Sequence, residues 1–200
     1  MNADVFNDVG GATTATGNSI TNYGLNGGTV SAAGIYAANQ WSLNISNNTL
    51  ISASHSHNLR GIYGVSGAGA NVTINNNNIN LTSSSTTGLH QVVGIDNTIG
   101  STASSNTVNI NNNTVTGSYP NATSQYFWGI NNAAICTNLN MNGNSVINTT
   151  YGNATTVPTA EWRGINNAAT GCLNVTMNNN IVSGNTIYST LVGSATASAC

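Results

Sequence analysis

A short pattern recurs six times along the chain and constrains its fold more than any other feature. Two apolar residues alternate, a corner with asparagine follows, and a third apolar residue resumes, as in Leu139, Met141, Asn144 and Val146. The asparagine keeps its place in every copy, at Asn18, Asn48, Asn77, Asn113, Asn144 and Asn180. An apolar period of two is typical of β-strands, because successive side chains of a strand point to opposite faces. The pattern therefore predicts two short strands joined at a fixed corner.

A Gly-Ile pair follows each corner and marks a third strand. The pairs begin at five glycines, with Gly193-Ser194 as a degenerate sixth: Gly34, Gly61, Gly94, Gly129 and Gly164. The asparagine corners are about 29 to 36 residues apart, which is the range of solenoid repeats. We therefore predict an all-β fold, a parallel β-helix of about six coils, as a single β-solenoid domain over residues 1–200.

Stacked coils explain the unusual composition. Asparagine makes up about a fifth of the residues, and charged residues make up 3%, against about 25% in a typical soluble domain. In-register stacking puts identical positions beside one another, where like charges would repel. We expect the corner asparagines to take the left-handed backbone conformation and to hydrogen-bond along their column as a ladder.

Composition also argues against two classes of partner. With two basic residues, the chain cannot build a phosphate-neutralising surface for nucleic acid. No apolar run approaches the roughly 18 residues of a membrane-spanning helix. Met1–Val5 has neither the basic nor the apolar region of a signal peptide.

These units resemble the repeats of the right-handed parallel β-helix superfamily, to which pectate lyases, tailspikes and adhesin passenger domains belong. The strand–asparagine corner–strand pattern and the Gly-Ile step carry the resemblance over roughly residues 13 to 200. The most similar subgroup is the Asn-, Thr- and Gly-rich β-solenoids of bacterial surface adhesins and fibres. The resemblance implies right-handed coils and an extracellular or cell-surface location, but the superfamily hosts both enzymes and structural fibres.

Little in the sequence indicates a catalytic or metal site. Polysaccharide-cleaving members of the superfamily use clustered Asp, often with Ca²⁺, whereas the acids here are scattered: Asp4, Asp8, Asp96 and Glu161. Asp96 and Glu161 could form a glycosidase pair only within about 10 Å of each other. His55 and His57 could share a face and take a metal, but His90 belongs to the next coil, so we interpret them as solvated loop residues. We predict no catalytic residue, no metal and no cofactor.

Three cysteines occupy one column on successive coils. Cys136 and Cys172 each precede the second apolar residue of a repeat by five residues, and Cys200 follows Gly193 as Cys136 follows Gly129. Two interpretations stay open. Adjacent thiols could form a disulfide between coils, which suits an oxidising exterior, or all three could be buried free thiols.

Aromatic residues gather beside the two longest loops and could form a contact patch for sugar rings or a partner chain: Tyr119, Tyr126, Trp128, Tyr151 and Trp162. The alternative is that they cover the core where the loops leave the stack.

The leading functional hypothesis is a non-enzymatic extracellular β-solenoid, structural or adhesive, of a cell-surface fibre, filament or sheath. Solenoids ordinarily need polar caps, and neither end of the sequence has one. We therefore expect the chain to be either a segment of a longer repeat protein or a filament subunit that self-associates head to tail or laterally. The main alternative is a β-helix that binds or cleaves polysaccharide, with surface glycans as partners. Ice binding ranks lower, because the column of Thr49 and Thr114 is interrupted by Asn78 and other residues.

Overall fold

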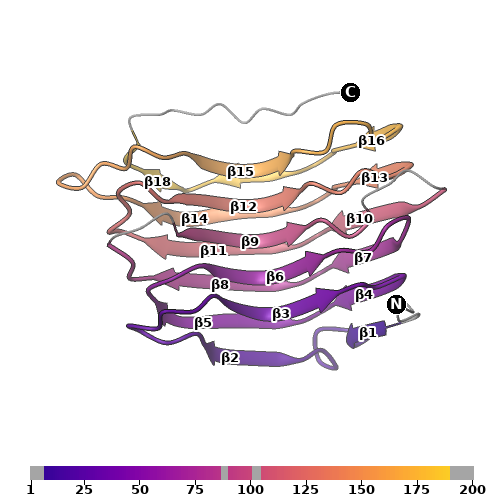
Figure 1. Ribbon diagram of the computed structural model, residues 1–200, viewed down its shortest axis with the longest axis horizontal. Helices are drawn as coiled ribbons and strands as arrows, with labels where there is room; N and C mark the ends of the chain where they lie inside the picture. The colour runs from indigo at the N-terminus through magenta and orange to yellow at the C-terminus, as the bar shows by residue number, and fades with distance from the viewer. Residues whose placement is uncertain (1–6, 87–89, 101–104, 190–200) are drawn as a thin grey trace.

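The computed structural model describes residues 7–86, 90–100 and 105–189 and contains no helix in these ranges. The strands form three parallel sheets, and each turn of the chain passes once through every sheet (Figure 1). In the view of Figure 1 the chain runs to the right along the near sheet, returns behind it and rises, so the coil is right-handed. The prediction of a right-handed parallel β-helix is confirmed.

The first sheet holds the strand that precedes each asparagine corner. Its strands, in spatial order, are β1 (Asn7–Gly10), β4 (Ser42–Ser46), β7 (Asn71–Asn75), β10 (Thr107–Asn111), β13 (Asn138–Asn140) and β16 (Asn174–Thr176).

The second sheet holds the strand that follows each corner. Its strands are β2 (Ser19–Tyr23), β5 (Thr49–His55), β8 (Asn78–Ser83), β11 (Thr114–Tyr119), β14 (Ser145–Tyr151) and β17 (Ile181–Ser183), and β18 (Thr186–Ile187) also pairs with β14.

The third sheet carries the Gly-Ile pairs. Its strands are β3 (Ala32–Ala38), β6 (Leu59–Val65), β9 (Gln91–Asn97), β12 (Tyr126–Asn132) and β15 (Trp162–Asn167).

The number of coils is close to the prediction. The third sheet has 5 strands and the first sheet has 6, so the described residues make five complete turns and begin another. The sixth step that we predicted, Gly193-Ser194, lies outside them. The longest dimension of the molecule runs along the strands rather than along the stack (Figure 1).

The alternating apolar residues of the repeats stack into columns, and these columns form the core. Ile45, Ile74 and Ile110 are in register and fully buried. On the second sheet Leu50, Ile79, Val115 and Val146 are likewise in register and fully buried, whereas Val182 on the last described strand of that column is 42% exposed. Because each coil contributes one residue to each column, no coil can bury its apolar face alone.

The asparagine ladder joins every pair of neighbouring coils. Asn113 shows its chemistry: Oδ1 accepts hydrogen bonds from the backbone N–H and from Nδ2 of Asn77, both at 3.0 Å. Nδ2 of Asn113 donates to Oδ1 of Asn144 at 3.1 Å and to the carbonyl of Ile74 at 2.7 Å. The same contacts recur from coil to coil, so Asn18, Asn48, Asn77, Asn113, Asn144 and Asn180 form one continuous ladder.

The left-handed backbone at the corner belongs to a different residue than expected. Positive φ angles occur one position before the ladder, at Asn47 (62°), Asn76 (57°) and Asn112 (55°), and Gly143 (64°) takes that place in the next coil. The turn and the bond between coils are therefore made by two neighbouring residues. One residue makes the turn, for which Asn and Gly are suited, and the next turns its carboxamide inward to bond the coils.

A second ladder runs along the end of the third sheet, and we did not predict it. Nδ2 of Asn97 donates to Oδ1 of Asn132 at 3.0 Å, and Nδ2 of Asn132 donates to Oδ1 of Asn167 at 3.1 Å. All three side chains are buried. Their signal in the sequence is the asparagine that ends each of the last three Gly-Ile segments.

Steric crowding explains why glycine occurs in the Gly-Ile pairs. A Cβ atom on Gly129 would lie 2.5 Å from the carbonyl oxygen of Gly164 and 2.6 Å from the side chain of Val146. Gly94 has the same surroundings one coil earlier. Each such glycine lets the backbone of the next coil and a valine of the second sheet approach closely.

Replacing the central ladder residue should weaken the whole stack. Asn113→Ala leaves a buried backbone N–H and buried carbonyl and carboxamide groups without partners, at about 1–3 kcal/mol for each group. We expect the free energy of unfolding in urea to fall by about 2–4 kcal/mol. Asn80→Ala is the control, because Asn80 is exposed on β8, and surface changes usually stay within about 0.5 kcal/mol. Equal effects of the two substitutions would contradict a structural role for the ladder.

Candidate functional site

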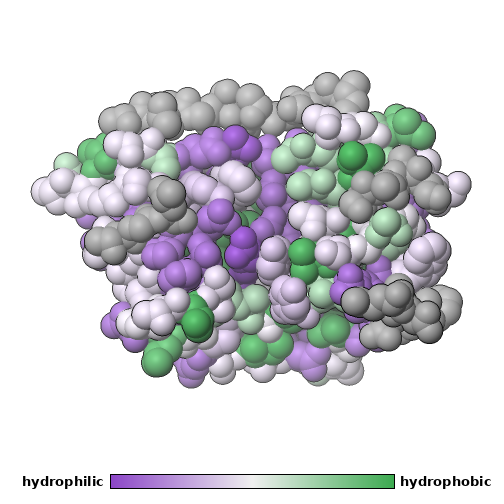
Figure 2. All heavy atoms as spheres, viewed as in Figure 1, coloured by the Kyte–Doolittle hydropathy of each residue, from purple (hydrophilic) through white to green (hydrophobic). Residues whose placement is uncertain are grey.

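The outward surface of the third sheet gathers most of the charge of the chain, and we call it the charged face. Its side chains form three in-register columns: Ser31, Asn58, Gln91, Tyr126 and Glu161; Ala33, Arg60, Val93, Trp128 and Arg163; and Tyr36, Tyr63, Asp96, Asn131 and Asn166. Hydrophilic residues run up the middle of this side of the molecule (Figure 2). Both basic residues of the chain and two of its four acids lie here.

Arg60 is held on three sides. Its Nε lies 2.9 Å from Oδ2 of Asp96, one of its terminal nitrogens donates to Oε1 of Gln91 at 2.8 Å, and its guanidinium carbon lies 4.3 Å from the ring centre of Tyr63. The Arg60 and Asp96 side chains are only 13% and 11% exposed. The ion pair is therefore shielded from water, and the guanidinium has a fixed orientation on the face.

A second charged cluster lies near the last described coils. Arg163 pairs with Glu161 at 2.8 Å and lies 5.1 Å from the ring centre of Trp128. The Trp128 ring stacks on Tyr126, with centroids 4.4 Å apart and planes inclined by 24°. Two stacked aromatic rings and one guanidinium group thus lie together on this part of the face, and the cation is attracted to the face of the Trp128 ring.

A strip of carboxamides extends from Asp96 along the next two coils. Nδ2 of Asn131 donates to Oδ1 of Asp96 at 3.0 Å, and Nδ2 of Asn166 donates to Oδ1 of Asn131 at 2.7 Å. All three residues are buried. The Asp96 carboxylate is thereby satisfied by Arg60 on one side and by an amide on the other.

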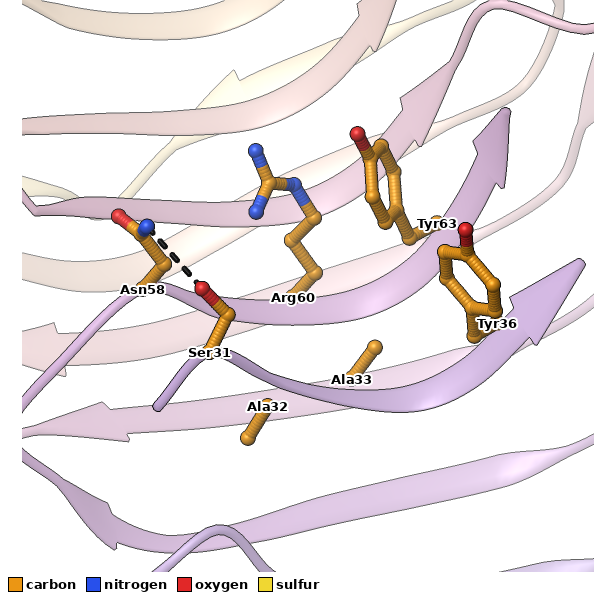
Figure 3. A pocket seen from close by; sticks show the side chains of 7 residues that line it. All are labelled: Ser31, Ala32, Ala33, Tyr36, Asn58, Arg60 and Tyr63. Carbon is orange, nitrogen blue, oxygen red and sulfur yellow. Dashed lines mark hydrogen bonds between the residues drawn. The ribbon is translucent and has the colours of Figure 1, made fainter. Parts of the chain in front are cut away.

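A shallow cavity of about 470 Å³ opens at the first coils of the charged face. Its lining residues are Ser31, Ala32, Ala33, Tyr36, Asn58, Arg60 and Tyr63 (Figure 3). Arg60, Tyr63 and Tyr36 rise on the same side of β3 and β6 (Figure 3). The two tyrosine rings are 5.5 Å apart and inclined by 55°, and Tyr36 is 63% exposed. The cavity combines aromatic surface, a fixed cation and the amide of Asn58.

Asp96 and Glu161 do not form a carboxylate pair. They lie two coils apart, and the register puts Glu161 five residues before the position that matches Asp96. These offsets correspond to about 10 Å across the stack and about 17 Å along the strands. The separation exceeds the roughly 10 Å that a glycosidase pair spans, and each acid is already engaged by its own arginine.

Three of the five aromatic residues beside the long loops cover the core, which is the alternative to a contact patch. Tyr119 and Tyr151 are fully buried, and Trp162 is 8% exposed. The two tyrosines pack edge to face at 6.2 Å, and Trp162 donates its Nε1 proton to Oγ1 of Thr149. Strand alternation explains the split: these side chains point inward and cover the core, whereas Tyr126 and Trp128 point outward onto the charged face.

The cysteine column is confirmed as far as the structure describes it. Cys136 and Cys172 lie on adjacent coils with Sγ atoms 3.4 Å apart, and both are buried free thiols. Burial, together with the neighbouring Cys172 thiol, raises the pKa of Cys136 to about 12. Cys200 lies outside the described residues.

His55 is not the solvated loop residue that we expected. It is 2% exposed, and its ring nitrogens lie 3.0 Å from the carbonyl oxygens of Leu25 and Val30. His55 therefore fastens the loop between β2 and β3 to the neighbouring coil. Sequence spacing could not reveal this contact, because the partners lie 25 to 30 residues away.

In the part of the chain that the structure describes, no group of three or more His, Cys, Asp or Glu side chains could hold a metal ion. Within the same residues, no helix is long and apolar enough to cross a membrane.

The outward surface of the first sheet is the counterpart of the charged face. Its columns consist mainly of Asn, Ser and Thr, such as Thr73, Asn109 and Asn140 in one column. Nδ2 of Asn140 donates to Oδ1 of Asn109 at 2.8 Å, so neighbouring side chains satisfy one another. Asp8 is the one charged residue among the described positions of this surface.

Comparison with known proteins finds no matching family model, no matching curated protein and no matching solved structure.

The two described thiols should be inert while the protein is folded. Because the thiolate is the reactive form and the pKa of Cys136 is raised to about 12, little of it exists at pH 8. In a Cys200→Ser background, we expect a thiol reagent to label Cys136 and Cys172 only after unfolding in denaturant. Rapid labelling of the folded chain, or an intact mass lower by two hydrogens, would contradict two buried free thiols.

Proposed function

We propose that this protein is a non-enzymatic β-solenoid that serves as a structural and adhesive element of a cell-surface fibre, filament or sheath outside the cell. The observation that carries the proposal is that the scaffold is the same in every described coil, whereas the charged and stacked aromatic side chains are concentrated on one face. The corner ladder of asparagines and the backbone pairing repeat through all the described coils, whereas both arginines and the stacked pair Tyr126 and Trp128 lie on one face.

The scaffold suits a mechanical role. Each coil is joined to the next by three sets of backbone hydrogen bonds and by buried carboxamide bonds. Buried polar networks in which every member has its partners resist rearrangement, because any shift leaves a group unpaired in a medium of low dielectric constant. Such a stack holds the residues of one face at fixed spacing.

Surface glycans are the partners that the charged face fits best, and polysaccharide binding is therefore the second candidate function. Sugar rings carry apolar patches that pack on aromatic side chains and hydroxyls that bond to amides and guanidinium groups. The cavity bounded by Tyr36, Tyr63, Arg60 and Asn58 offers these groups. Its volume of about 470 Å³ falls within the range of small-molecule sites.

Loss of the two tyrosines should weaken adhesion. We expect the Tyr36→Ala, Tyr63→Ala double variant to bind a glycan array or intact cells at least about 10-fold more weakly, since an aromatic contact contributes about 0.5–1.5 kcal/mol beyond the area it buries. The matched control is Thr73→Ala, Asn109→Ala on the first sheet, which should bind like the parent chain. Equal binding by both double variants would contradict the charged face as the adhesive surface, and release of reducing sugar would contradict a non-enzymatic role.

Self-association is part of the proposal, because unpaired strand edges at the end of a stack can pair with another chain. We expect light scattering and electron microscopy of concentrated protein to show oligomers or filaments. A lysine on an edge strand discourages such pairing, so Thr21→Lys on β2 should shift the distribution to monomer. Asn80→Lys, on an interior strand of the same sheet, is the control. A parent chain that stays monomeric at high concentration would contradict assembly.

A further inference from the structure

Two histidines that are 33 positions apart in the sequence meet where the chain enters the third sheet. The pairing of β6 with β9 aligns Leu59 with Val92, which puts His57 and His90 at the same position of successive coils. Their ring centroids are 4.0 Å apart and their planes are inclined by 40°. The sequence separates these residues into different repeats, and the stacking of the coils brings them together.

The pair has an unused nitrogen. Nδ1 of His57 is buried and has no hydrogen-bond partner among the described residues. A buried polar atom without a partner costs free energy, so its retention calls for an explanation such as an unfilled ligand position. His55, two residues earlier, is different: the backbone of Leu25 and Val30 occupies its ring nitrogens.

The titratable groups around His90 are imidazoles. Burial, followed by the neighbouring His57 and His55, lowers the pKa of His90 and thereby favours its neutral form. The one acid of β9, Asp96, is bound to Arg60. Neutral imidazole is the form in which histidine binds metals.

We propose that His57 and His90 form a two-imidazole site for a transition-metal dication of the Zn²⁺, Cu²⁺ or Ni²⁺ class, with water completing the coordination shell. A bound Zn²⁺ takes a nitrogen from each ring at about 2.0–2.1 Å. The stacked rings then turn from their present contact so that one nitrogen of each faces the ion. The metal would join two coils at a point where no asparagine ladder runs.

The ligand set determines which cations bind. Imidazole nitrogen suits Zn²⁺, Cu²⁺ and Ni²⁺, whereas Mg²⁺ and Ca²⁺ require oxygen ligands. This site is independent of the charged face, so its failure would leave the adhesive function untouched.

The experiment is calorimetric titration of the Cys200→Ser chain with Zn²⁺ alone at pH 7.5, with Mg²⁺ as the reference cation. We expect saturable binding of one Zn²⁺ per chain, a higher melting temperature with Zn²⁺, and no response to Mg²⁺. His57→Gln and His90→Gln keep polar side chains of similar size, and circular dichroism verifies their fold. Each should weaken Zn²⁺ binding by at least about 10-fold, the lower end of the loss that removing even an outer-shell partner causes.

A second measurement needs no substitution. Because metal and proton compete for the same nitrogens, Zn²⁺ binding by the parent chain should be lost as the pH is lowered from 7.5 to 5. Absence of Zn²⁺ binding at pH 7.5, an equal response to Mg²⁺, or Zn²⁺ binding that survives in both folded Gln variants would overturn the proposal.

Discussion

In-register stacking of the coils is the constraint on which the rest of the structure depends. Parallel strands lie about 4.8 Å apart, so every residue has its equivalent of the next coil as its nearest neighbour. Charge is poorly tolerated under this rule, whereas asparagine is favoured because its amide can donate to the same group one coil away. The ladder through Asn48, Asn77 and Asn113 is the direct result, with each side chain bonded to the next at 3.0 Å.

The same constraint explains how the few charged residues are accommodated. Arg60 and Arg163 lie in one column but are separated by Val93 and Trp128, so like charges never meet on adjacent coils. Each arginine finds a carboxylate and an aromatic ring instead. The charged face is thus compatible with the fold because its columns vary in composition, while the ladder columns do not.

Much of the fold could be predicted from the sequence because the repeat pattern reports on neighbours that stacking makes unavoidable. The ladder residues, the apolar columns and the Gly-Ile strand follow directly from it. The orientation of individual side chains could not be predicted from the repeat pattern. Trp128 and Trp162 seemed equivalent beside their loops, yet one lies on the surface and the other covers the core.

The candidate sites were less predictable for a physical reason. Contacts such as the one between His57 and His90, or between Arg60 and Asp96, join residues about one repeat apart, and loops of variable length hide the register between them. The corner shows a finer limit: the pattern located the asparagines but assigned the left-handed backbone to the wrong one of two neighbours, since Asn47 turns the chain and Asn48 bonds the coils.

The ladder also gives the stack a direction. In every rung, Nδ2 of the earlier asparagine donates to Oδ1 of the later one, from Asn18 to Asn180. The amide dipoles of the column are therefore aligned head to tail, and their fields add along the axis instead of cancelling. A donor edge and an acceptor edge are chemically different surfaces, so a further coil can extend the column only if it keeps the same polarity, and two stacks meeting edge to edge in opposite senses would bring like groups together.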